Sequence, residues 1–406
     1  MKIIYLHQYF SNLNGNVGTR SFEMGRRLVK MGHEVHMITS YTDKTDDYEW
    51  FETLEEGINV HWYPVKYRNS DGFSARILAF FKFSLAALIK GRTLSGDVVF
   101  ATSTPLTIII PGFFIARKLS IPLVFEVRDL WPELPIAIGV LKNPLSKFMA
   151  RMLEKFAYRN SNKIVALSDG MRDGVLKLDY PEKDISVIPN SCDLNFFKID
   201  DEVKVRNDFR EQHGIPLDAK VILYAGTFGR INGVGYMVEL ASQLAEHTNI
   251  FFFAVGHGAE FSNVSMLATK AGVLGNNFIL KESLRKSEMP NLFCSADVIL
   301  SLFIPLVEME ANSANKFFDG LSAGRCVLTN YGGWQEALLQ ESQAGFRLSR
   351  KADVAADQIQ KLFDSPELIE SCGRNARAAG KKFFSRDKLA KKLERVLSSA
   401  IDGSPC

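Results

Sequence analysis

The chain has 406 residues, with 49 Lys and Arg against 46 Asp and Glu, a formal net charge of +3 and a hydrophobic content of 46%. Because a single core usually stops growing at roughly 250 to 300 residues, this length predicts two domains. The near balance of charges argues against a nucleic-acid partner. Five cysteines, an odd number without a C-x-x-C pair, are typical of reduced thiols in a cytosol and argue against a zinc site.

The first predicted element is an apolar strand at residues 3–6 with no basic-then-apolar leader before it, so we expect no secretory signal and a cytoplasmic protein. A glycine segment, GNVGTR at 15–20, then leads into a run with helical spacing. The spacing of Gly15 and Gly18 is not the dinucleotide fingerprint, and no cofactor is predicted. Backbone N–H groups between a strand and a helix can still surround an anionic group. The alternative is a turn that only packs the helix on the sheet.

Residues 72–96 combine aromatic and aliphatic residues with Arg76, Lys82, Lys90 and Arg92 and contain no acid until Asp97 follows. The longest charge-free run, 83–89, is far too short to span a bilayer. Such a mixture suits the interface of an anionic inner leaflet, and we predict peripheral membrane attachment through this segment, with Phe80 and Phe81 at the contact. The alternative is a buried domain helix whose long cations reach water.

The next window, residues 98–116, has no charge, but prolines and hydroxyl residues interrupt it. We therefore predict a buried strand at 98–102, a turn and an apolar helix in place of a membrane span. Further strand-like runs lie at 35–39, 123–127, 163–167 and 185–188. After them a segment rich in turn residues, 188–205, predicts a linker.

Beyond the linker the pattern starts again, with strand-like runs at 221–225, 250–255, 278–280, 298–302 and 326–329 and helical stretches such as 235–247 and 316–323 between them. Strands alternating with helices predict parallel sheets. The fold class is therefore α/β, with two doubly wound, Rossmann-like domains facing across a cleft. Open sheets of this kind bind ligands at the carboxyl ends of their strands. From residue 354 onward the sequence is nearly all helical and ends in a basic amphipathic helix.

Several motifs in this order resemble those of the retaining, nucleotide-sugar-dependent glycosyltransferases of the GT-B fold, family four. The likeness is strongest to the bacterial O-antigen and capsule type that includes N-acetylfucosamine transferases. The motifs are HQYF at 7–10, EVRDLWPE at 126–133, VIPNSCDLNFF at 187–197, YAGTFGRINGV at 224–234, AVGHGAE at 254–260 and NKFFDGLSAGRCVLTNYGGWQEAL at 315–338.

The resemblance implies an acceptor-binding domain at 1–190, a nucleotide-sugar-binding domain at 191–385 and a C-terminal helix at 386–406 that packs back on the first domain. It implies transfer of a sugar from a nucleotide-diphosphate donor, such as UDP-N-acetylfucosamine, to a polyprenyl-diphosphate-linked saccharide in surface polysaccharide synthesis. A membrane-bound acceptor agrees with attachment to the inner leaflet. We expect neither a metal nor a cofactor, and no nucleic-acid partner.

For the donor, the resemblance places Asp319 on the ribose hydroxyls. The family's earlier glutamate falls on Ala311, so Glu308 is the candidate taken in its place, with Glu310 as the alternative. The family's diphosphate-binding Arg and Lys fall on Thr227 and Asn232. The remaining predicted donor residues are Gly15, Gly18, Gly229, Arg230, Gly256, Lys281, Asn315 and Lys316, with Arg230 and Lys316 as the cations for the leaving diphosphate.

For the acceptor, Arg128 and Asp129 follow the predicted strand 123–127, where many relatives carry a His-Asp pair. Asp129 is predicted to accept the proton of the attacking hydroxyl or to orient it, with Arg128 beside it. The alternative is a structural Arg-Asp pair in a loop. His7 and Asn16 are predicted to contact the acceptor.

Two other classes share the fold prediction. A non-hydrolysing nucleotide-sugar epimerase needs several acid-base groups around one sugar, whereas this sequence offers one aspartate of the first domain, Asp129, at the predicted cleft. A non-catalytic nucleotide-sugar-binding protein would fit the missing glutamate and lysine.

Overall fold

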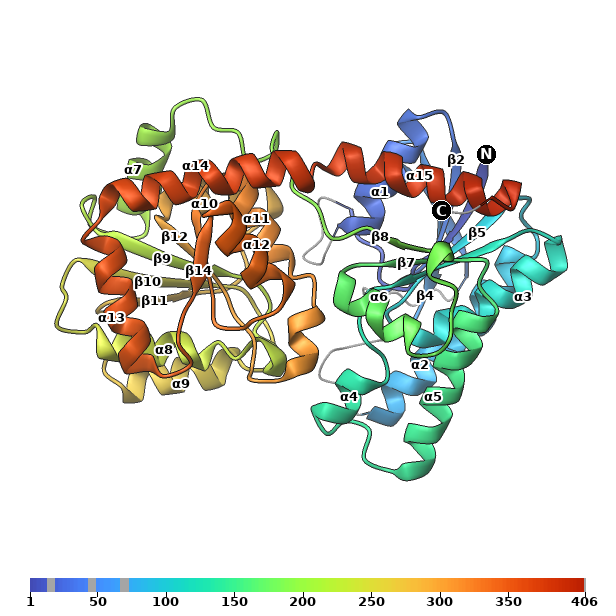
Figure 1. The fold of residues 1–406 in the computed structure, drawn as a ribbon, viewed down its shortest axis with the longest axis horizontal. Helices are drawn as coiled ribbons and strands as arrows, with labels where there is room; N and C mark the ends of the chain where they lie inside the picture. The colour runs from blue at the N-terminus through green and yellow to red at the C-terminus, as the bar shows by residue number, and fades with distance from the viewer. Residues whose placement is uncertain (13–18, 43–48, 66–72, 405–406) are drawn as a thin grey trace.

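The computed structural model describes residues 1–12, 19–42, 49–65 and 73–404, giving residues 73–76 as backbone. Two α/β units lie side by side, each with its own sheet and buried core (Figure 1). All the strand pairings described, except that of β3 with β4, are parallel. The predicted fold class is therefore confirmed.

The first sheet has the order β3-β4-β2-β1-β5-β6-β7-β8. Its strands are β1 (Lys2–Leu6), β2 (Glu34–Tyr41), β3 (Phe51–Glu55), β4 (Ile58–Pro64), β5 (Val98–Thr102), β6 (Leu123–Val127), β7 (Lys163–Ala166) and β8 (Ile185–Val187). Six of these match the predicted runs. The hairpin β3-β4 was missed, although its two-residue turn, Glu56 and Gly57 with φ of +50° and +84°, follows a known pattern.

Helices cover both faces of this sheet. They are α1 (Arg20–Lys30), α2 (Phe73–Gly91), α3 (Ile109–Leu119) after the short η1 (Leu106–Ile108), α4 (Glu133–Ala137), α5 (Pro144–Arg159) and α6 (Asp169–Leu176), with the short η2 (Glu182–Asp184) before β8. Alternate residues of β1 point to opposite faces. Ile3 and Tyr5 share a core with α1 and α15 (Arg386–Asp402), while Ile4 and Leu6 share one with α2, α3, α5 and α6.

The second sheet has the order β11-β10-β9-β12-β13-β14. Its strands are β9 (Lys220–Ala225), β10 (Ile250–Val255), β11 (Phe278–Lys281), β12 (Val298–Ser301), β13 (Cys326–Thr329) and the unpredicted β14 (Gly345–Arg347). Its α-helices are α7 (Glu202–Gln212), α8 (Gly235–Gln243), α9 (Phe261–Lys270), α10 (Met289–Ser295), α11 (Asn315–Ala323), α12 (Trp334–Ser342), α13 (Ala352–Phe363) and α14 (Pro366–Phe383). Short 3-10 turns are η3 (Arg230–Asn232), η4 (Lys286–Glu288) and η5 (Val307–Ala311). Because α7 starts at Glu202, the predicted linker ends earlier than residue 205.

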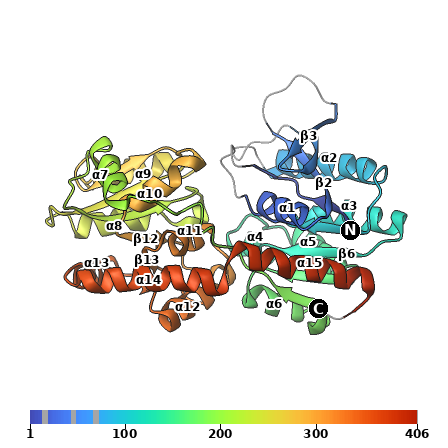
Figure 2. The ribbon, with the colours of Figure 1, turned by 90° about the horizontal axis from the view of Figure 1, so that it is seen from above.

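The chain passes between the two units twice, and the two passages are hydrogen-bonded to each other. The Cys192 N–H donates to the Phe384 carbonyl at 2.8 Å, and the Arg386 N–H donates to the Cys192 carbonyl at 3.3 Å. Figure 2 shows α14 beside the second unit continuing into α15 beside the first. The last helix therefore adds its apolar side to the core of the unit formed by the first half of the chain.

Residues 98–116 form β5, η1 and most of α3, as the prolines predicted. Among the residues described, no helix combines the length and apolar character needed to cross a bilayer.

Candidate active site

The two sheets enclose a cavity of about 550 Å³ at the carboxyl ends of their strands. In the first sheet β1 lies between β2 and β5, and in the second sheet β9 lies between β10 and β12. At β1 and at β9 the order of the strands therefore switches from one side of the sheet to the other. Crevices at such switch points are where open α/β sheets bind ligands. The strand-end loops contribute His7, Thr104, Arg128, Asp129, Thr227, Gly256 and His257 to the lining.

The wall from the first sheet carries the predicted pair Arg128 and Asp129, together with His7. Arg128 Nη1 donates to His7 Nε2 at 3.0 Å, and Thr104 Oγ1 donates to Asp129 Oδ2 at 2.7 Å. Burial, and then the Arg128 charge, lowers the pKa of His7 well below its usual value, so its imidazole is neutral. Burial raises the pKa of Asp129 against the opposing effects of Thr104 and Arg128. An aspartate with a raised pKa is a stronger proton acceptor.

A buried ion pair that the sequence analysis missed supports this wall. Arg20, the first residue of α1, donates to Glu126 Oε1 through Nη2 at 2.8 Å and to the Pro189 carbonyl through Nη1 at 2.6 Å. Both side chains of the pair are almost completely buried. Burial raises the pKa of Glu126, but Arg20 overcomes this effect and the net pKa is lowered. The sequence signal was a cation directly after GNVGT and an acid at the end of a buried strand.

The wall from the second sheet is built around the first turn of α11. Asn315, Lys316 and Asp319 all line the cavity, as predicted. Lys316 is buried, with Nζ at 2.7 Å from Asn232 Oδ1 and at 4.9 Å from the Tyr224 ring centroid. Burial lowers its pKa to about 7. Among the described residues, no carboxylate forms an ion pair with Lys316, so its charge is available to an anion in the cavity.

Other predicted donor residues lie outside the lining. Arg230 is exposed in η3, Lys281 is exposed at the end of β11, and Glu308 lies in η5, while Gly229 precedes η3. Of the two cations predicted for the leaving diphosphate, Lys316 therefore lies in the cavity and Arg230 does not. Gly15, Asn16 and Gly18 lie outside the described residues. Lining residues that were not predicted include Tyr9, Arg20, Asn190, His257, Lys286 and Arg386.

Ala311, where the family pattern has a glutamate, is a contact between the two units. Ser168 Oγ, at the start of α6, donates to the Ala311 carbonyl at 2.5 Å. A Cβ atom added to Gly170 would lie 2.7 Å from the Ala311 Cβ. Gly170 therefore has no room for a side chain of its own, because α6 packs directly against Ala311. Glu310, the alternative candidate, is close to Gly332 and Gly333 and is also absent from the lining.

Gly256 lines the cavity for a backbone reason. Its φ is +152°, and an added Cβ would lie 1.8 Å from the Gly226 carbonyl oxygen. The absence of a side chain lets the loops after β9 and β10 approach each other, which leaves backbone at the cavity wall.

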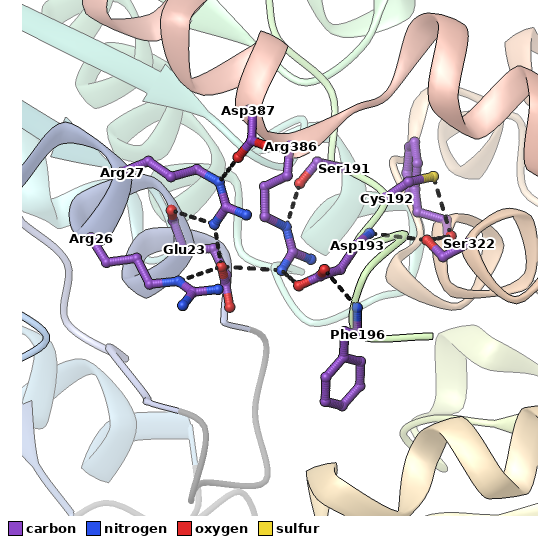
Figure 3. Close-up of polar contacts among 11 residues, drawn as sticks. Glu23, Arg26, Arg27, Ser191, Cys192, Asp193, Phe196, Ser322, Arg386 and Asp387 are labelled. Carbon is purple, nitrogen blue, oxygen red and sulfur yellow. Dashed lines mark hydrogen bonds and ion pairs between the residues drawn. The ribbon is translucent and has the colours of Figure 1, made fainter. Parts of the chain in front are cut away.

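Arg386 lines the cavity, and it also contacts both the first passage between the two units and helix α1 (Figure 3). Its Nη1 lies 2.8 Å from Asp193 Oδ2 and 3.2 Å from Glu23 Oε2. The same Glu23 oxygen accepts a hydrogen bond from Arg26 Nε at 2.8 Å and another from Arg27. Burial raises the pKa of Glu23, but the three guanidinium groups lower it overall.

Comparison with known sequences agrees with this two-part architecture. Residues 15–191 match the family model described as glycosyl transferase 4-like domain, and residues 205–379 match the one described as glycosyl transferases group 1. N-acetyl-alpha-D-glucosaminyl L-malate synthase of Bacillus anthracis is 22% identical over 390 residues, 94% of this chain and 93% of that one. Alpha-D-kanosaminyltransferase of Streptomyces kanamyceticus is 23% identical over 285 residues, 65% and 67% of the two chains.

Solved structures show the same fold. HepE of Anabaena in complex with UDP and glucose has a TM-score of 0.73 at 16% identity, covering 98% of this chain and 100% of that one. WaaG, a glycosyltransferase involved in lipopolysaccharide biosynthesis, has a TM-score of 0.72 at 16% identity, covering 98% and 99%. Together the two family models span most of the sequence, and the fold has its cavity where the two domains meet. The chain is therefore a glycosyltransferase of the GT-B type, built from a glycosyl transferase 4-like domain and a group 1 glycosyl transferase domain.

Proposed function

We propose that the protein transfers a sugar, with retention of configuration and without a metal, from a nucleotide-diphosphate donor to a lipid-linked saccharide. The observation that carries this proposal is the composition of the cavity between the two domains. The buried Lys316, which has no carboxylate partner in the described part of the chain, lies on the wall from the second sheet, and Asp129 with its raised pKa lies on the wall from the first.

The donor proposed is a uridine diphosphate sugar. HepE, which has the same fold, is described in complex with UDP and glucose. The first turn of α11 has N–H groups that favour phosphate, and Lys316 adds a positive charge at the same end of the helix. Its Nζ binds Asn232, the position that carries a lysine in the family pattern. We infer that Lys316 supplies from α11 the ammonium group that relatives supply from the loop after β9. Asp319, one turn further along α11, accepts hydrogen bonds from the ribose hydroxyls.

For the chemistry, the acceptor hydroxyl attacks the anomeric carbon from the face that the diphosphate leaves. The leaving phosphate oxygen takes the hydroxyl proton, so retention needs no second protein carboxylate. In this route Asp129 accepts a hydrogen bond from that hydroxyl and orients it. In the alternative route Asp129 takes the proton in place of the phosphate oxygen. The guanidinium of Arg128 lies beside it and forms a hydrogen bond with the neutral imidazole of His7, which keeps both side chains in place.

The sugar and acceptor proposed are an N-acetylated deoxyhexose, such as N-acetylfucosamine, and a polyprenyl-diphosphate-linked saccharide of O-antigen or capsule synthesis. This follows from the motif resemblance, and WaaG shows that the fold serves lipopolysaccharide biosynthesis in that protein. The proposed domain bounds remain 1–190, 191–385 and 386–406. An acceptor held in a bilayer places the enzyme at the inner face of the plasma membrane as a peripheral protein.

The test is a mass-spectrometric screen of nucleotide sugars with a polyprenyl-diphosphate-linked N-acetylhexosamine acceptor. We expect the acceptor mass to increase by one sugar, most with UDP-N-acetylfucosamine. An isomerised free donor would instead indicate an epimerase, and donor binding without any product would indicate a binding protein. The Streptomyces kanosaminyltransferase and WaaG are glycosyltransferases by name, and no observation here favours either alternative.

A further inference from the structure

Large apolar side chains are exposed in regular positions along the outer side of α2. Leu78, Phe81, Leu85 and Ile89 are each more than half exposed. Their spacing of three or four residues puts them on one face of the helix. The opposite face, which includes Phe83, is buried in the core of the first domain. Phe80 is also buried and packs near Tyr9, so it is not available for the membrane contact predicted from the sequence.

A second stripe of the same kind lies on α5, where the sequence analysis predicted nothing. Leu145, Phe148, Met149 and Met152 follow helical spacing and are each exposed by 51% to 64%. Both helices cover the same face of the first sheet, and both contact α3 and η1. Phe114 of α3 is exposed as well. Solvent-exposed apolar residues gathered on one layer mark an interaction surface.

The charge of this layer is strongly one-sided. The helices α2, α3 and α5 contain nine Lys or Arg residues and one acid, Glu154. Two of these cations, Lys90 and Arg151, form ion pairs with Glu52 and Glu133 of neighbouring elements. The whole chain has 49 basic and 46 acidic residues, so the remainder has an excess of acids. Glu154 is buried and accepts a hydrogen bond from the Tyr158 hydroxyl at 3.2 Å. Burial raises its pKa to about 7, so it offsets little of the positive charge.

We propose that the outer surface of α2, α3 and α5, called here the basic apolar face, binds an anionic lipid bilayer. Apolar residues that enter the acyl boundary beside cations that meet phosphate head groups are the features of interfacial helices. A second copy of this chain is disfavoured as the occupant, because a twofold contact would bring two positively charged surfaces together. The proposal rests on the peripheral membrane location proposed above and assigns it a surface.

The basic apolar face adjoins the acceptor wall of the cavity. Phe80 of α2 packs near Tyr9, which lines the cavity. On the other side, Arg151 of α5 binds Glu133, at 3.2 Å, in the helix that follows the Asp129 loop. A bilayer against this face would therefore lie beside the wall where a lipid-linked acceptor is expected.

The test measures binding of the full-length protein to vesicles of phosphatidylglycerol and of phosphatidylcholine at low salt. We expect binding to the anionic vesicles, weaker binding as salt is added and little binding to the neutral ones. Phe148→Ser with Met149→Ser should lower the partition coefficient at least tenfold. Lys147→Gln with Lys155→Gln should lower it about 25-fold, since each cation contributes about fivefold.

Matched controls lie on the second domain, away from this face. Met266→Ser with Val203→Ser removes apolar residues of similar exposure, and Lys270→Gln with Lys361→Gln removes two exposed cations. Both controls should bind like wild type. Absence of binding by folded wild-type protein, equal binding to neutral vesicles, or undiminished binding by the α5 variants would each overturn the proposal. A dimer detected by light scattering would also overturn the proposal if the α5 variants disrupted it.

Failure of this proposal is distinguishable from failure of the proposed function. UDP binding and sugar transfer to an acceptor solubilised in detergent do not need the bilayer. If transfer is present and vesicle binding is absent, the basic apolar face is wrong and the enzymatic proposal stands. If no donor supports transfer and vesicle binding responds to the variants as expected, the basic apolar face is supported as a membrane-binding surface and the enzymatic proposal is wrong.

Discussion

Asp319 is the residue whose role is tested most simply, because it lines the cavity from the side of α11 that also presents Lys316. Replacement by alanine removes two charge-assisted hydrogen bonds to the ribose, so we expect UDP to bind more weakly by about 1 to 3 kcal/mol. Isothermal titration calorimetry measures this difference. Glu308→Ala is the matched control, because Glu308 does not line the cavity, and it should leave the affinity unchanged. Unchanged affinity in Asp319→Ala would remove Asp319 from the donor site.

Lys316 should make UDP binding depend on pH. Burial lowers its pKa to about 7 in the free protein, and a diphosphate beside it would raise that pKa. As pH rises above 7, Lys316 of the free protein loses its proton, and that proton must be taken up again for the ammonium group to bind the diphosphate. We therefore expect affinity to fall by up to about tenfold per pH unit between pH 7 and 9. In Lys316→Met most of this slope should disappear, since the terminal phosphate of UDP, with a second pKa of roughly 6 to 7, gains little charge as the pH rises further. An equally steep slope in the variant would assign the effect to another group.

At the scale of elements, the passages between the domains depend on Glu23 of α1. Its side chain is 1% exposed, and one of its oxygens is within reach of Arg26, Arg27 and Arg386. Glu23→Gln leaves three guanidinium groups without their shared anion, so we expect the free energy of unfolding to fall by about 3 kcal/mol. Urea denaturation measures it. Asp387→Asn is the control, because Asp387 is 71% exposed and its ion pair with Arg27 should contribute little.

The same cluster gives a pH dependence with a definite sign. The folded pKa of Glu23 is lower than its unfolded value, so its stabilisation is present above about pH 4.5, the unfolded value, and is lost as pH falls through the folded pKa. The stability difference between wild type and Glu23→Gln should therefore be largest near neutral pH and should narrow in acid. A difference that stays constant with pH would mean that the glutamate charge is not what stabilises the junction.

At the scale of the whole molecule, we propose that the second sheet supplies the residues that bind the donor and the first sheet those that bind the acceptor. Asp129→Asn keeps the shape of the side chain and removes its basicity. We expect transfer to fall roughly 10²-fold with UDP affinity near wild type. If Asp129 must be ionised, wild-type activity should also fall as pH drops through its raised pKa, and this acid limb should be absent from the variant. Normal turnover in Asp129→Asn would leave Asp129 a structural role.

The hydrophobic pattern of the sequence determined the architecture. Strand-like runs such as residues 123–127 and 250–255 coincide with β6 and β10, because strands buried on both faces are continuous apolar segments. It also brought Asp129, Lys316 and Asp319 to one cavity, since parallel strands and the helices that follow them present their loops at one edge of a sheet. The hairpin β3-β4 was missed because its strands are short, partly exposed and mixed in polarity.

Tertiary structure alone decided which candidate side chains meet. Arg20 and Glu126 are 106 residues apart and form a buried pair only because α1 packs beside the end of β6. Arg230 and Lys316 look equally suitable in sequence, yet η3 leaves one in solvent, while α11 buries the other beside Asn232. The exposed stripe on α5 was invisible for the same reason. Periodicity shows that a helix has an apolar side, but burial depends on what packs there, and only the assembled layers show that Phe83 is covered while Phe81 and Phe148 are not.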